Sequence, residues 1–521
     1  MIDDDKRLLP VFATPAHLEI YDIQDAVYDM QLSVTTLAGL INRGQPRVYL
    51  LSNNDADSLF NALLAHVPHE HVNTGELGTL DAMLQTYRDT VKGMVIYDPA
   101  MPDSVNVATT MAGLRGAIVV SPRQAATLQQ KPYQLPIVAD LRTYHWKNRL
   151  QAYRWAEDNL LKEASKQVVA GLNPTIAGGL RSYLVATRSF VYWLNPLHIL
   201  PDPVGGWAIE RCLMKRIMRA YPPGTSHLGW FINEFAGVDI ASKAALYTLP
   251  SDYFFNLEVW SAVQPSVNMV DRSHEGRLRR PRPYTVRGSE PARIYISFTI
   301  SDGDNLQFNQ HRMYRLWQDT ARGTIPLGWT IAPTLIEAAP TLAAYYRKTA
   351  TQNDELIAGP SGAAYMWPSY WPAERLSAYL QRTGALMQQM DLHSIEVLDG
   401  LLSRLFPFRA WQEQYAKSLS PFGVRCILTG DSYRRGDWRV VSGVPVIKNL
   451  GLAKNAAQTL ALIQNNTPVQ IQGPAFLNVY IYAWSMTPTD ISKLVQGLDN
   501  RYTVVTPGQL GALIAQVQEG R

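Results

Sequence analysis

The hydrophobic pattern of the chain alternates between helical and strand-like segments from the start. Apolar positions recur at helical spacing over residues 26–42 and again over 104–114. Short apolar runs, which predict buried strands, cover residues 47–51, 93–97 and 117–121. Because the connections between these segments are short, we predict two small α/β units, over residues 1–90 and 91–150.

The pattern changes after Asp140, where long helical stretches carry many aromatic side chains. These are Tyr153, Trp155, Tyr183, Phe190, Tyr192 and Trp193. We therefore predict a mostly helical middle domain over residues 151–285. Its last part, residues 271–288, holds six arginines and two prolines, a composition typical of an extended connector.

From Arg293 onward, apolar runs alternate with helical segments such as residues 337–351 and 373–390. Most runs are continuously apolar, as expected for strands covered on both faces. The runs are residues 294–300, 327–331, 363–367, 394–398, 424–428, 445–447, 469–471, 476–483 and 502–505. We predict a (β/α) barrel-like domain over residues 286–521, in preference to an open doubly wound sheet. The fold class is therefore α/β and multi-domain.

Composition narrows the range of functions. The 521 residues have a formal net charge of +4 and 18% charged side chains, which argues against a nucleic-acid-binding protein. Two cysteines, Cys212 and Cys426, rule out a disulfide framework. The chain lacks an apolar run long enough to span a membrane. We expect neither a nucleic acid nor a membrane as partner, and the expected partner is a small-molecule or oligosaccharide substrate. Composition does not indicate an oligomeric state.

The first residues, 1–7, are acidic and lack the basic and apolar regions of a secretory signal. This favours a cytoplasmic protein. A secreted protein is the alternative if a leader had been trimmed from the chain.

The segment most informative for chemistry is residues 296–305, an apolar run that leads into two carboxylates. Asp302 and Asp304 flank Gly303, which permits a tight turn. Side chains at the carboxyl end of a barrel strand lie where such barrels build active sites. We expect Asp302 and Asp304 to be catalytic, with Asn305 binding the substrate. The structural alternative is a capped turn in which Asp304 or Asn305 starts the next helix.

A second segment, residues 359–372, combines a small-residue turn with four aromatic side chains and three prolines. Flat rings cover the apolar face of a sugar, and prolines limit the cost of ordering a loop. An aromatic cluster that only packs is the alternative interpretation. The residues predicted to line a substrate cleft are Trp329, Tyr365, Trp367 and Trp484.

Residues 362–368 resemble the signature of the GxGYxYP family of glycoside hydrolases, and residues 301–305 are similar to the acidic motif of its C-terminal domain. Further similar stretches are residues 36–43, 227–234, 328–333, 478–484 and 504–507. The signature departs at Ala364 and Trp367, where the family has glycine and tyrosine. The resemblance implies a three-part N-terminal region, a barrel-like C-terminal domain and activity on sugars.

Glycoside hydrolysis normally needs two carboxyl groups, so the remaining acids matter. Asp399 directly follows the run 394–398 and is the preferred second acid, although a loop-capping role is the alternative. Asp431 occupies a comparable position. Glu234 and Asn256, from the middle region, are further candidates for substrate binding.

We therefore predict a carbohydrate-active hydrolase that uses strand-end carboxylates for acid/base chemistry in an aromatic-lined cleft. The sequence requires no cofactor and shows no histidine pair or zinc motif. One alternative is a metal-dependent, deacetylase-like hydrolase with a divalent ion at Asp302 and Asp304. Others are a non-catalytic glycan-binding protein and a family member recruited to intracellular chemistry on a non-sugar substrate.

Overall fold

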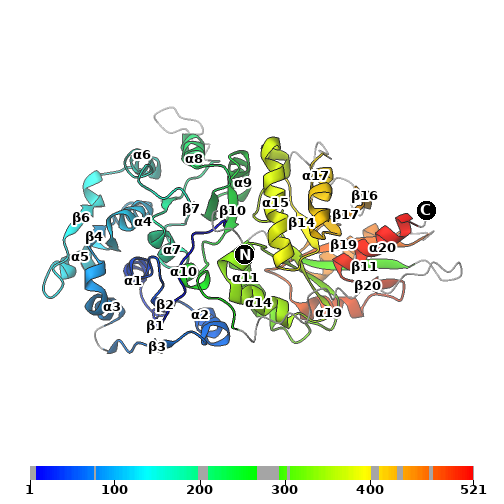
Figure 1. Ribbon diagram of the computed structural model, residues 1–521, viewed down its shortest axis with the longest axis horizontal. Helices are drawn as coiled ribbons and strands as arrows, with labels where there is room; N and C mark the ends of the chain where they lie inside the picture. The colour runs from blue at the N-terminus through cyan, green and yellow to red at the C-terminus, as the bar shows by residue number, and fades with distance from the viewer. Residues whose placement is uncertain are drawn as a thin grey trace. The chain divides into compact units, whose positions relative to one another are not determined.

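The computed structural model describes residues 7–75, 78–197, 209–266, 293–301, 305–400, 410–430, 438–468 and 473–519 (Figure 1). The chain forms two compact units: Met1–Ser266 with Glu337–Leu342, and Val267–Ile336 with Ala343–Arg521. The bounds of the four domains expected from sequence remain predictions. Among the described residues, none of the helices combines the length and apolar character needed to cross a membrane.

The N-terminal unit contains three small parallel sheets, ordered β2-β1-β3, β5-β4-β6 and β10-β9-β7-β8. The first two sheets comprise β1 (Leu18–Asp22), β2 (Val48–Leu51), β3 (His69–His71), β4 (Gly93–Ile96), β5 (Ala117–Val120) and β6 (Ile137–Asp140). Their helices are α1 (Tyr28–Ile41), α2 (Asn54–Leu59), α3 (Thr79–Tyr87), α4 (Ser104–Arg115), α5 (Pro122–Leu128) and α6 (Arg149–Asn159). The α/β alternation predicted for this region is confirmed.

The mostly helical middle region is not confirmed, because that region contains a four-stranded parallel sheet. Its elements are β7 (Val168–Gly171), α7 (Arg181–Ala186), β8 (Phe190–Tyr192), α8 (Ile209–Arg219), β9 (Ser226–Gly229), α9 (Glu234–Lys243), β10 (Tyr247–Pro250) and α10 (Leu257–Trp260). The strands have only three or four residues and include serine, histidine and glycine, so their apolar runs are too short to predict a sheet. The arginine-rich connector lies outside the described residues.

The C-terminal unit is built on one large sheet, ordered β16-β17-β15-β14-β13-β12-β11-β19-β18, with β20 beside β11. All its neighbouring strands are parallel except β16 and β17. The strands are β11 (Ile294–Ser301), β12 (Leu327–Ile331), β13 (Asp354–Ala358), β14 (Ser394–Val397), β15 (Cys426–Thr429), β16 (Trp438–Val441), β17 (Val444–Lys448), β18 (Leu452–Ala453), β19 (Ala475–Tyr482) and β20 (Tyr502–Val504). The helices are α11 (Asn305–Gln310), α12 (Arg312–Trp317), α13 (Leu335–Ala338), α14 (Pro340–Thr349), α15 (Ala373–Gln389), α17 (Ala410–Leu419), α18 (Ala456–Asn466), α19 (Pro488–Gln496) and α20 (Pro507–Glu519).

Most strands predicted for this unit are confirmed, but the strand expected at residues 363–367 is a loop with a single bridge residue. The sequence patterns also fail to predict β13, β16 and β18. The strand predicted at 469–471 lies outside the described residues.

The sheet curls into part of a barrel. The hydroxyl of Ser301 on β11 donates to Glu396 Oε1 on β14 at 2.6 Å, although two strands lie between β11 and β14. Three strand spacings of about 4.8 Å would separate these residues by roughly 14 Å in a flat sheet. The curl therefore brings carboxyl-end side chains together across the concave face. Within the described residues β16 and β18 stay at opposite edges, so a complete barrel is not confirmed.

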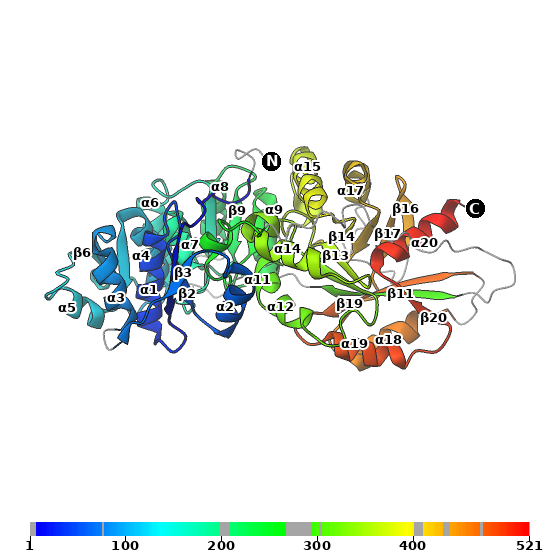
Figure 2. The ribbon, with the colours of Figure 1, turned by 60° about the horizontal axis from the view of Figure 1, so that its bottom comes forward.

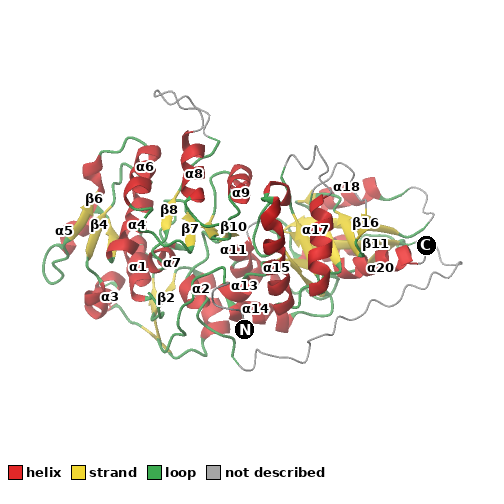
Figure 3. Cartoon of the chain, turned by 45° about the horizontal axis from the view of Figure 1, so that its top comes forward, coloured by secondary structure: helices red, strands yellow, loops and turns green. Residues whose placement is uncertain are grey.

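Helix α20 packs against the concave face of the curled sheet, contacting β11, β15, β17 and β19. Leu510, Leu513 and Ile514 of α20 share one apolar cluster with Tyr295 and Phe476, near the starts of β11 and β19. Figure 2 shows α15 and α17 on one side of the sheet and α18 and α19 on the other, and Figure 3 shows α20 beside β11 and β16. The apolar cluster thus joins α20 to the concave face of the sheet.

Helix α19 begins with a capping box that gives a simple test of local stability. The Thr487 hydroxyl accepts from the Asp490 N–H, and the Asp490 carboxylate accepts from the Thr487 N–H. We expect Thr487→Ala to lower the free energy of unfolding by about 1 kcal/mol, because an N–H at the helix start loses its partner. Urea denaturation measures the change, and Thr487→Ser is the matched control. Equal stability of the alanine and serine variants would contradict this account of the cap.

Candidate functional site

The carboxyl ends of the parallel strands form the candidate site. Asp302 and Asp304 lie outside the described residues, but their neighbours Ser301 and Asn305 are described and buried. Ser301 is the last residue of β11, and Asn305 is the first residue of α11. In the chain, the acidic pair is therefore preceded by a buried strand end and followed by a buried helix start.

Glu396 is a carboxyl group at this edge that the sequence analysis missed. It is fully buried on β14, next to the backbone of Gly359, where an added Cβ would lie 3.0 Å from Glu396 Oε2. Burial raises the pKa of Glu396 to about 7, against the opposing effects of Ser301 and Tyr480, whose side chains face the carboxyl. Glu396 can therefore hold a proton near neutral pH.

Several buried polar atoms on the strands of the curled sheet and at the start of α11 have no hydrogen-bond partner among the described residues. They include Glu396 Oε2, both amide atoms of Asn305, Thr429 Oγ1 and Asn478 Nδ2. Asn305 also has a positive φ of 37°, which is uncommon for a residue other than glycine. Buried polar atoms are nearly always paired, so this group provides donors and acceptors that a bound molecule could use.

The polar layer continues down the concave face through β11 and β19. Asn478 Oδ1 accepts from the Ser297 hydroxyl at 2.9 Å and from the Thr299 hydroxyl at 3.0 Å. These bonds orient the Asn478 amide and leave Nδ2 as its remaining donor.

The Asp399 carboxylate accepts hydrogen bonds from neighbouring protein groups. These donors are the backbone and hydroxyl of Ser369 and the N–H of Gly400. Burial raises the pKa of Asp399, and these donors oppose that rise. This geometry matches the loop-anchoring alternative for Asp399 more closely than the role of second acid.

The aromatic residues predicted to line a cleft differ in their surroundings. Tyr365 and Trp367 are buried, with 3% and 4% of their surface exposed. Trp484, which follows β19, is 41% exposed and meets Phe308 edge-to-face at 6.4 Å. Of these three, only Trp484 presents a large exposed ring surface, and their binding roles stay predictions.

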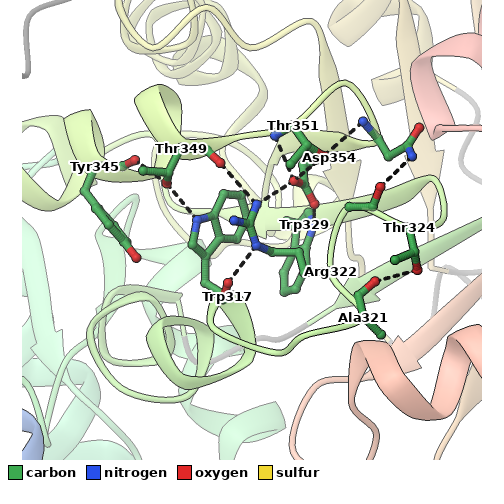
Figure 4. A network of polar contacts seen from close by, with 11 residues as sticks. Trp317, Ala321, Arg322, Thr324, Trp329, Tyr345, Thr349, Thr351 and Asp354 are labelled. Carbon is green, nitrogen blue, oxygen red and sulfur yellow. Dashed lines mark hydrogen bonds and ion pairs between the residues drawn. The ribbon is translucent and has the colours of Figure 1, made fainter.

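Trp329 lies elsewhere, in the packed layer between β12 and the neighbouring helices. It is fully buried, meets Trp317 at 5.0 Å, and its indole N–H donates to Asp354 at 3.0 Å (Figure 4). Arg322 completes this network through its ion pair with Asp354. Trp329 therefore supports the sheet, and its role in lining a cleft stays a prediction.

Glu234 and Asn256 belong to the N-terminal unit. Glu234 is the first residue of α9, whose cap is Asn233. The Asn256 side chain pairs with the backbone of Leu50, accepting at 3.0 Å and donating at 2.9 Å. Both hydrogen-bonding ends of Asn256 thus hold β2, and substrate binding by either residue stays a prediction.

The altered signature position Ala364 causes no backbone strain. Ala364 lies outside the positive-φ region, and its N–H and carbonyl both bond the Tyr379 hydroxyl. The glycine that the turn requires is Gly362, with φ 126°, where an added Cβ would meet the Thr383 hydroxyl oxygen at 2.6 Å. No group of three or more His, Cys, Asp or Glu side chains suited to a metal ion occurs in the described part of the chain.

Family models match four consecutive stretches of the chain. The model described as "GxGYxYP putative glycoside hydrolase C-terminal domain" matches residues 292–515. The first, second and third N-terminal domains of the same family match residues 17–89, 91–164 and 166–262. No curated protein matches the chain.

One solved structure is similar over nearly its whole length. It is described as a "putative hydrolase from Bacteroides thetaiotaomicron VPI-5482" and has a TM-score of 0.80 and 22% sequence identity. The match covers 99% of this chain and 98% of that chain. At this identity the similarity shows a shared fold.

Proposed function

We propose that the chain, which belongs to the GxGYxYP family as the four matching models show, hydrolyses glycosidic bonds at the carboxyl edge of the curled sheet. The observation that carries the proposal is the hydrogen bond from Ser301 to Glu396. It connects a buried, protonatable carboxyl to the residue that directly precedes Asp302.

The two roles of glycoside hydrolysis need carboxyl groups with different pKa values. Glu396, with a pKa raised to about 7, is the general acid, and Oε2 is the atom that carries the proton. Asp302 or Asp304 is the ionised partner. Their position beside Ser301 in the chain supports this assignment.

In the proposed reaction, Glu396 transfers its proton to the glycosidic oxygen while the bond from that oxygen to the anomeric carbon breaks. The ionised aspartate takes a proton from the attacking water, or attacks the anomeric carbon itself before water releases the sugar. Asn305, Thr429 and Asn478 would offer hydrogen bonds to the hydroxyls of the sugar, because each has a buried polar atom without a partner among the described residues.

The proposal is tested by release of reducing sugar from a panel of glycans. We expect wild type to release sugar and Asp302→Asn or Asp304→Asn to lower kcat by about 10²-fold or more, because the ionised partner is lost. Incubation with a chelator is the control for the metal-dependent alternative and should leave activity unchanged. Equal turnover by wild type and both variants would remove the acidic pair from catalysis.

A further inference from the structure

Both oxygens of the Asp399 carboxylate are occupied by the protein. Oδ1 accepts from the Ser369 N–H at 3.1 Å and from the Gly400 N–H at 2.9 Å, and Oδ2 accepts from the Ser369 hydroxyl. Ser369 lies in the middle of a short helical turn, Pro368–Tyr370, inside the aromatic-rich loop. Asp399, which follows β14, therefore fastens this turn to the sheet.

The backbone of Gly400 packs closely against two rings of the same turn. A Cβ added at Gly400 would lie 2.4 Å from Tyr370 Cε2 and 2.7 Å from Trp367 Cε3, which is closer than real contacts allow. The rings of Trp367 and Tyr370 also meet each other, with centroids 5.6 Å apart. Asp399 thus holds the backbone of the turn while Gly400 leaves room for its two rings.

Side chains of α15 and α17 contact the other end of the loop. The Tyr379 hydroxyl on α15 donates to the carbonyl of Ala364 at 2.6 Å, and its ring meets Trp371 at 5.0 Å. The Tyr415 hydroxyl on α17 donates to the carbonyl of Ser361 at 3.0 Å. With both helices holding the loop on one side, Asp399 and Gly400 fix the position of the rings on the other.

We infer that Asp399 is a positioning residue that fixes the loop carrying Trp367 and Tyr370 beside the substrate site, and that it does not transfer a proton in the reaction. The inference rests on the proposed function for its substrate. A carboxylate that already accepts three protein hydrogen bonds must give some of them up to act as an acid or base, whereas Glu396 Oε2 has no such partner among the described residues. Rings held in place before binding lower the cost of ordering the site.

Three variants separate positioning from proton transfer. Asp399→Asn keeps an oxygen for the Ser369 and Gly400 N–H groups and adds an NH₂ that can donate to the Ser369 hydroxyl. It should retain most of kcat and keep KM within about threefold of wild type. Asp399→Ala and Gly400→Ala should raise KM by about tenfold or more with a smaller change in kcat, because both displace the rings.

A fall in kcat for Asp399→Asn as large as that for Glu396→Gln would overturn the inference. Ser369→Ala removes one donor without touching the carboxylate and should raise KM in the same direction, which covers the case in which Asp399→Ala does not fold. An unchanged KM in Ser369→Ala and Gly400→Ala would also overturn it.

If wild type releases no sugar from any glycan, the proposed function fails. The effect of Asp399 on the loop is then measured without substrate, by acrylamide quenching of Trp367 fluorescence. The Trp367 contribution to acrylamide quenching is obtained by comparison with Trp367→Phe in each background. Quenching should rise in Asp399→Ala and stay at the wild-type level in Asp399→Asn. Equal quenching in all backgrounds would show that Asp399 does not fix the ring.

Discussion

Replacing Glu396 by glutamine is expected to lower kcat by about 10²–10⁴-fold, because the amide cannot protonate the leaving oxygen. The substitution keeps the size of the side chain and an oxygen that can accept from Ser301. Steady-state kinetics on a glycan hydrolysed by wild type measure the effect. Ser301→Ala is the matched control: it removes the hydrogen bond to Oε1 and should reduce kcat much less than Glu396→Gln.

The raised pKa also predicts how activity and stability depend on pH. Glu396 must be protonated to act as the acid, so kcat/KM should fall as pH rises through about 7. The folded protein holds the Glu396 proton above the ordinary carboxyl pKa of 4.5, so stability should fall between pH 4.5 and about 7. Glu396→Gln should weaken this fall in stability, which thermal denaturation at both pH values would detect. An identical pH dependence of stability in the two proteins would contradict the buried, protonated state.

The largest loss of stability is expected from Asp354→Ala. The fully buried Asp354 side chain pairs with Arg322 at 2.6 Å and accepts from the Trp329 indole N–H at 3.0 Å. Removing it leaves a largely buried guanidinium without its carboxylate, a change that typically costs about 3–5 kcal/mol. Urea denaturation followed by tryptophan fluorescence measures the loss, since Trp317 and Trp329 both lie in this network (Figure 4).

An exposed pair in the same unit provides the control. Asp499 pairs with Arg501 at 2.8 Å, but both side chains are about half exposed, at 48% and 53%. Asp499→Ala should therefore lower the free energy of unfolding far less than Asp354→Ala does, because solvent screens the exposed pair. Similar losses for Asp354→Ala and Asp499→Ala would contradict the importance given to burial.

Strand β13, one of those that the sequence patterns do not predict, shows why part of the fold could not be predicted. β13 begins with Asp354 and Glu355, which break the apolar pattern expected of a buried strand. Both acids have specific partners: Asp354 pairs with Arg322, and Glu355 accepts from the Gly508 N–H at the start of α20 at 2.7 Å. These partners lie 32 and 153 positions away in the chain, so local periodicity carries no trace of them.

The candidate site also depends on contacts between residues that are distant in the chain. Asp399 was noticed because it follows an apolar run, whereas Glu396 was missed because it lies within that run. A carboxylate inside an otherwise apolar strand is the available signal, since burying it costs free energy unless it is paired or hydrogen-bonded. The curl of the sheet, which brings Ser301 to Glu396, depends on pairings between distant strands and could not be derived from spacing.

The central claim is that Glu396 gives the proton to the leaving group, and the most direct test varies the leaving group itself. The glycan that wild type hydrolyses would be compared with the dinitrophenyl glycoside of the same sugar, which departs without protonation. Glu396→Gln should slow the glycan by about 10²–10⁴-fold and the dinitrophenyl glycoside by less than about tenfold. Equal slowing of both substrates would contradict the account.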